Sequence, residues 1–217
     1  MRSRITTVIL LIGVLFSLAL LAGKFNSSRL PGNQEGYEPP QPIAYSHRLH
    51  AGELKIECLY CHSNAALSRH AGIPSANICL NCHIKVRSSF GAVRHEDEVA
   101  EKEKRKPRAI VSSELGKFYS AVGLDPAGEP NVEGVTQSIS WTRVHNLPDY
   151  VYFDHRAHVR VGVACQTCHG PVEAMERMRQ HSSLSMGWCV NCHRESNDRG
   201  VQGQRVYASI DCATCHY

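Results

Sequence analysis

Five copies of one short motif constrain this chain more than any other feature of its sequence. Each copy reads Cys-x-x-Cys-His, and together the copies use all ten cysteines of the 217-residue chain. In such a unit the two cysteines can form thioether bonds to one haem, while the following histidine places an imidazole under the iron. The cysteines are Cys58, Cys61, Cys79, Cys82, Cys165, Cys168, Cys189, Cys192, Cys212 and Cys215, and the histidines are His62, His83, His169, His193 and His216. The sequence therefore predicts five covalently bound c-type haems, with these histidines as the proximal iron ligands.

Zinc is the main alternative ligand for so many cysteines. The gaps between successive Cys-x-x-Cys pairs within each half of the chain have the length seen in zinc ribbons. However, an odd number of pairs cannot all be grouped into four-cysteine zinc sites. A histidine also follows every pair. With only 13 histidines in 217 residues, this would not be expected by chance. The spacing and the histidines together favour haem.

An uncharged apolar run from Ile5 to Gly23 is long enough to cross the hydrocarbon core of a bilayer as one helix. Arg2 and Arg4 precede the run and only Lys24 directly follows it, so the positive-inside rule places the N-terminus in the cytoplasm. A cleaved signal peptide is the alternative interpretation, although the run is longer than a typical signal core. We expect a single-pass protein of the bacterial cytoplasmic membrane, with its haem domain on the periplasmic side.

A duplicated segment precedes the first and the third attachment unit. The first copy reads Tyr45-Ser-His47-Arg-Leu-His50 and the second reads Phe153-Asp-His155-Arg-Ala-His158. In multihaem cytochromes of the class III type, such a pair of histidines sends its imidazoles to two different irons, and this chain resembles that arrangement. The expected distal iron ligands are His47, His50, His155 and His158. The duplication predicts two related modules, the first with two haems and the second with three.

One iron still needs a distal ligand after these four histidines are assigned. His145 lies just before the second copy of the repeat and is the expected fifth ligand. The alternatives are His70, His181 and Met186, and a methionine would give a haem of higher reduction potential. His95 opens a run of mixed charges and is not an expected ligand.

The expected fold is mostly irregular with short α-helices, as in class III or c7-like multihaem cytochromes c, plus one N-terminal transmembrane helix. Ordinary apolar side chains are scarce outside the membrane run, so porphyrin faces are expected to fill the interior. The predicted organisation is an anchor at 1–24, a proline-rich spacer at 25–43, a dihaem module at 44–94, a charged helix or linker and loop at 95–140, and a trihaem module at 141–217. The formal charge of +4 becomes negative once the haem propionates are counted, so nucleic acid is not an expected partner.

Two further stretches support a closer resemblance. They run from Trp141-Thr-Arg-Val-His to Tyr-Phe-Asp-His155 and from Met186-Gly-Trp to Cys189. With the N-terminal span and the five attachment units, they resemble the membrane-anchored pentahaem cytochrome c subunit of alternative complex III. The resemblance implies an electron carrier without catalytic residues of its own. It also implies three kinds of partner: an iron–sulfur subunit, multispanning quinol-binding subunits, and a periplasmic cytochrome c or terminal oxidase as acceptor.

Two other functional hypotheses compete with this one. A NapC/NrfH-like quinol dehydrogenase also has a single span and four or five haems, but those enzymes carry a methionine just after an early attachment unit. Here Ser63 and Ile84 follow the first two units. A haem reductase with one five-coordinate iron is disfavoured, because the chain has more spare histidines than its five irons need.

Overall fold

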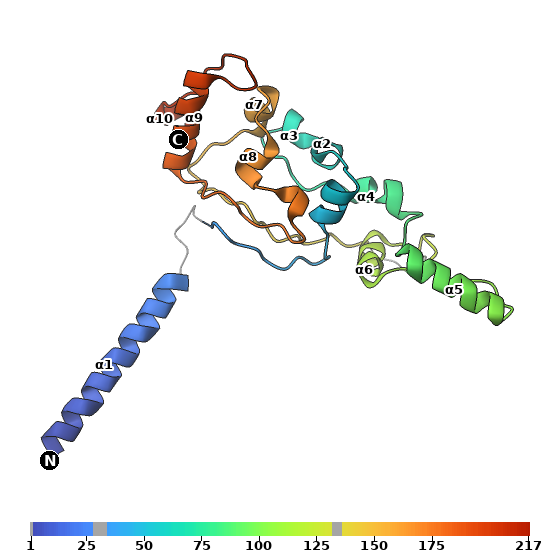
Figure 1. Cartoon of the computed structure of the whole chain (residues 1–217), viewed down its shortest axis with the longest axis horizontal. Coiled ribbons are helices and arrows are strands. Elements are labelled where there is room, and N and C mark those ends of the chain that lie inside the picture. Colours follow the sequence, from blue (N-terminus) through green and yellow to red (C-terminus); the bar gives the residue numbers. More distant parts are fainter. Residues whose placement is uncertain (1, 28–33, 132–135) are drawn as a thin grey trace.

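Helices joined by irregular segments make up the computed structural model of this chain (Figure 1). The structure describes residues 2–27, 34–131 and 136–217. Within these ranges the β-structure is limited to isolated bridges, between Leu124 and Pro130, Val151 and His216, and Val201 and Gln204. The expected fold class, short helices in a mostly irregular chain with an apolar N-terminal helix, is confirmed.

The N-terminal helix α1 spans Arg2–Ser27 and forms a separate rod in Figure 1. Its segment Arg4–Lys24 is 21 residues long, apolar, and not buried against the rest of the protein. By length and composition this helix could cross a membrane. Part of the predicted spacer, residues 28–33, lies outside the described residues. Residues 34–43 are not a free spacer, since Gly36 donates a backbone hydrogen bond of 2.8 Å to Gln180.

Short helices at the centre of the molecule pack in two reciprocal pairs. The π-helix η1 (Arg48–Glu53) packs against the 3-10 helix η2 (Val172–Ala174), and α7 (His155–Arg160) packs against α3 (Asn64–Leu67). Thus η1, in the first copy of the duplicated segment, contacts the chain just after the third attachment unit. In the same way α7, in the second copy, contacts the chain just after the first attachment unit. The two modules are interlocked rather than placed end to end.

Two longer helices, α5 (Phe90–Lys102) and α6 (Ser113–Val122), lie at one end of the molecule, opposite α9 (Met186–Arg199) and α10 (Cys212–Cys215) in Figure 1. Helix α5 begins inside the predicted dihaem module, because the hydroxyl of Ser89 caps it. Helix α6 is buried at Phe118 and Tyr119, and the Tyr119 hydroxyl donates a hydrogen bond to the carbonyl of His83. This bond fixes the helix to the dihaem module. Residues 132–135, which belong to the predicted linker and loop at 95–140, lie outside the described part.

The apolar core of the described chain is small. Its buried apolar side chains are Ala65, Ala100, Phe118, Tyr119, Val144 and Met175. Many large apolar side chains near the attachment units, such as Leu54, Leu59 and Tyr60, remain exposed. A domain of this size usually buries far more of its own side chains. The arrangement fits a protein whose interior is completed by bulky apolar groups.

Candidate haem sites

Every attachment unit places its two cysteines on a helical turn. The helices that carry them are α2 (Cys58–Cys61), α4 (Ala76–His83), α8 (Cys165–His169), α9 and α10. Residues three apart on a helix lie on the same face, so both thiols of a unit point to the same side. All ten thiols are free in the structure. Each unit is therefore arranged to bond both vinyl groups of one haem.

Six of the imidazoles around these units share one hydrogen-bond pattern, in which Nδ1 lies within 3.1 Å of a backbone carbonyl oxygen. Such a bond fixes the ring and leaves Nε2 to bind a metal. The proximal rings with this bond are His62, His83 and His193, which contact the carbonyls of Gly72, Val86 and Ser209. The rings of the duplicated segment with this bond are His50, His155 and His158, which contact Ser46, Arg69 and Asp154.

Three proximal rings face a ring of the duplicated segment across a gap that suits one iron atom. Two imidazoles bound to opposite sides of an iron hold their centroids roughly 6 Å apart, because each metal–nitrogen bond is about 2 Å and each nitrogen lies about 1 Å from its ring centre. The observed centroid distances are 6.0 Å for His50–His83, 6.1 Å for His158–His193 and 6.5 Å for His155–His169. These residues fit haem iron.

His47 completes the duplicated set near the first unit. Its Nδ1 is buried and has no hydrogen-bond partner among the described residues, unlike the Nδ1 of the other three rings of the duplicated segment. Burial, and then the neighbouring His62, lower the pKa of His47 to about 4. The neutral form that burial favours is the form that binds metal.

The expected fifth distal ligand, His145, lies at a different kind of position. Its ring centroid is 4.5 Å from that of His169, which is shorter than the separation across an iron. The alternatives His70, His181 and Met186 are all exposed. The ring stacked on His216 belongs to Tyr150, at 5.8 Å, and no imidazole pair that includes His216 is found in the described part of the chain.

The aromatic ring of each duplicated segment packs against the imidazoles of both histidines that follow it in the sequence. Tyr45 is 4.9 Å from His47 and 4.4 Å from His50, measured between ring centroids. Phe153 has the same relation to its own pair, at 4.8 and 4.7 Å. The repeat pattern showed the aromatic residue but not this contact. The aromatic ring fixes the spacing of two rings that face different proximal histidines.

Thiols of neighbouring units lie close together in a definite order. Burial raises the pKa of one thiol in each neighbouring pair, and the thiol of the adjacent unit raises it further. These pairs are Cys61 with Cys82, Cys58 with Cys165, Cys168 with Cys192, and Cys189 with Cys215. These interactions link the second unit to the first, the first to the third, the third to the fourth and the fourth to the fifth.

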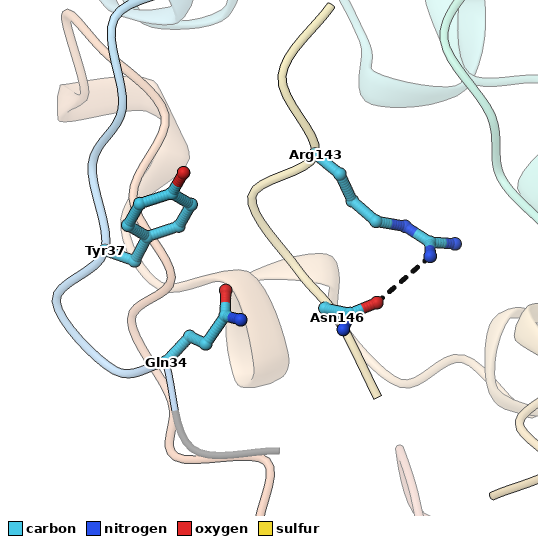
Figure 2. A pocket seen from close by; sticks show the side chains of 4 residues that line it. All are labelled: Gln34, Tyr37, Arg143 and Asn146. Atoms are coloured by element: carbon cyan, nitrogen blue, oxygen red, sulfur yellow. Dashed lines mark hydrogen bonds between the residues drawn. The ribbon is translucent and has the colours of Figure 1, made fainter. Parts of the chain in front are cut away.

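The surface pockets lie away from the thiols. One is lined by Gln34, Tyr37, Arg143 and Asn146, and Figure 2 shows the guanidinium of Arg143 donating a 3.0 Å hydrogen bond to the Asn146 carbonyl oxygen. It is open to solvent and no cysteine lines it, unlike a haem crevice. Within the described ranges, no three His, Cys, Asp or Glu side chains converge as a bare metal site would require.

Comparison with known proteins finds similarity to multihaem cytochromes c. Residues 151–217, which contain the last three attachment units, match the family model of cytochrome c7 and related cytochrome c. The chain is also 26% identical over 199 residues to the menaquinone reductase multiheme cytochrome c subunit of Nitratidesulfovibrio vulgaris strain Hildenborough, covering 81% of this chain and 76% of that protein. The chain is thus similar to multihaem cytochromes c, with a c7-like C-terminal part, and is related to the multihaem subunit of menaquinone reductase.

Proposed function

We propose that this chain conducts electrons through five covalently bound c-type haems, between a membrane complex linked to the quinone pool and a periplasmic acceptor. The observation that carries the proposal is the set of three imidazole pairs separated by 6.0, 6.1 and 6.5 Å, each with one proximal histidine. Haem iron held by two imidazoles supplies reversible one-electron chemistry and has no open position for a substrate. The residues serve to bind, orient and space the irons.

The duplicated segment supplies four of the distal ligands in this proposal. His47 and His50 serve the first and second units, and His155 and His158 serve the third and fourth. The three measured pairs support the last three assignments, and the burial of the His47 ring near His62, both of which lower its pKa, supports the first. The thiol contacts support a conduction path that runs from the second unit through the first, third and fourth to the fifth.

Helix α1 anchors the domain to the membrane in this proposal. Its apolar segment is long enough to span the bilayer, and the arginine excess before it keeps the haem domain outside the cytoplasm. The anchor would hold the haem chain beside the membrane subunits that exchange electrons with quinone. An anchor would be retained in the mature protein, whereas a signal sequence at residues 1–24 would be cleaved off.

We propose a complex of the alternative complex III type as the assembly, with an iron–sulfur subunit and multispanning quinol-binding subunits. Electrons would pass from quinol to a periplasmic cytochrome c or a terminal oxidase. The relative in N. vulgaris, named as a menaquinone reductase subunit, favours a second candidate in which electrons move toward menaquinone. The purified complex distinguishes them: menaquinol should reduce an oxidised cytochrome c in the first case, whereas reduced cytochrome should reduce menaquinone in the second.

Intact-mass analysis of the mature, denatured chain tests the haem content. We expect five haem additions, because five attachment units are complete and no cysteine is spare. The same measurement reports whether residues 1–24 are retained. Bound zinc, or fewer than five additions in fully matured protein, would contradict the proposal.

The isolated subunit tests where quinol reacts. The apolar segment Ile5–Gly23 is a single helix without an ionisable side chain, so it cannot enclose a quinol pocket or accept protons. A menaquinol analogue should therefore reduce the haems rapidly in the whole complex but not in the detergent-solubilised subunit. Rapid, inhibitor-sensitive reduction of the subunit alone would instead support a NapC/NrfH-like quinol dehydrogenase.

A further inference from the structure

The ring of His145 meets the proximal His169 at its outer nitrogen. Nε2 of His145 lies 3.3 Å from Nδ1 of His169, and the ring planes are close to perpendicular, at 75°. Both rings are partly buried. The contact is a hydrogen bond between two imidazoles, one of which belongs to an attachment unit.

An iron atom does not fit between these two rings. Their centroids are 4.5 Å apart, whereas opposite ligands of one iron need roughly 6 Å. His155 meets that requirement, since its ring lies 6.5 Å from His169 in a nearly parallel plane, at 9°. His155 therefore stands on the iron side of His169, and His145 stands behind it.

Other proximal rings use the same nitrogen differently. Nδ1 of His62, His83 and His193 is bonded to a backbone carbonyl, and a ring bound to iron through Nε2 carries its proton on Nδ1 and donates it there. At His169 the acceptor is an imidazole nitrogen, which is more basic than a peptide carbonyl. A stronger acceptor makes the ligand a better electron donor, and this stabilises ferric iron.

We propose that His145 is a positioning residue that accepts the hydrogen bond from Nδ1 of His169, fixes that ring, and lowers the reduction potential of the haem attached at Cys165 and Cys168. This inference rests on the proposed function, because it takes a haem at that unit as given. Nε2 of His145 is occupied by His169 and does not bind an iron. The third unit thereby differs from the neighbouring units in the middle of the chain of haems.

Two substitutions in the full-length, matured protein test the role of His145. His145→Leu removes the acceptor, and His145→Gln replaces it with an amide oxygen similar to a peptide carbonyl. His95→Leu, at an exposed position of α5, is the matched control. Intact mass, electron paramagnetic resonance and a spectroelectrochemical titration are recorded for each. We expect all variants to keep five haems and the spin states of the unaltered chain, with the midpoint of one haem raised in His145→Leu, raised less in His145→Gln, and unchanged in His95→Leu.

Two results would overturn the inference. A new high-spin signal in His145→Leu would make His145 an iron ligand, and an unchanged set of midpoints would reduce its role to packing. If His145→Leu does not mature, His145→Gln decides alone, since it keeps an acceptor and must still shift one midpoint. Fewer than five haems in the unaltered chain would contradict the proposed function instead.

Discussion

Replacing Gly52 by alanine tests how the two modules interlock. Gly52 lies in η1, and a Cβ added there would be 2.2 Å from the carbonyl oxygen of Glu173 and 3.2 Å from its carbon. Non-bonded carbon and oxygen atoms normally stay more than about 3 Å apart, so the backbone of one module must move by roughly 1 Å. Overpacking of this kind costs about 1–3 kcal/mol, which is roughly 5- to 150-fold in the unfolding equilibrium.

Alanine at Gly91 in α5 should raise the stability rather than lower it, because an added Cβ there meets nothing within 4 Å. Alanine is the better helix former, so Gly91→Ala should stabilise the helix by up to about 1 kcal/mol. Urea unfolding of matured protein, followed by circular dichroism, compares both variants with the unaltered chain. A Gly52→Ala variant as stable as Gly91→Ala would refute the close contact between η1 and η2.

Three further substitutions have defined outcomes. His50→Ala should create a high-spin signal from one haem in electron paramagnetic resonance, because His83 loses the ring 6.0 Å away; an unchanged spectrum would contradict the pairing. Tyr119→Phe should lower the free energy of unfolding by about 1 kcal/mol in urea, through loss of its bond to the His83 carbonyl; equal stability would show that the bond contributes nothing. The hydrogen bond from Arg105 lowers the pKa of Glu96 to about 2 from its ordinary 4.5. The stability this carboxylate adds is therefore complete above pH 4.5 and lost as the pH falls through about 2. Amide exchange at the end of α5 should show that loss, and Glu96→Gln should abolish the pH dependence.

Local patterns in the sequence predicted the parts of this structure that local geometry determines. A Cys-x-x-Cys-His unit needs only one helical turn, and each of the five lies on such a turn. The His-Arg-x-His repeat likewise places two imidazoles three residues apart, on one face of η1 or α7. These elements need no information about distant parts of the chain.

Contacts between distant segments could not be predicted in the same way. The guanidinium of Arg69 donates a 3.1 Å hydrogen bond to the carbonyl of Phe153, a residue 84 positions away, and lies 4.2 Å from the Tyr152 ring centroid. No periodicity in the sequence indicates that each module holds the other's histidine segment. The contact between His145 and His169 is also long-range, and the position of His145 before the repeat did not indicate it. Helix α6 was not predicted separately, because residues 95–140 were assigned only as a charged helix or linker and a loop.

The duplicated aromatic residue explains how a chain with so small a core can hold a series of irons. Phe153 contacts both His155 and His158, at 4.8 and 4.7 Å, and these rings face the proximal histidines of two different units. One packed aromatic side chain therefore fixes two proposed iron positions relative to each other. Tyr45 does the same in the first module, and the contact of Cys58 with Cys165 joins the two modules. Electron transfer depends steeply on distance but needs no substrate pocket, so in the proposed function these local contacts would space four irons without a large apolar interior.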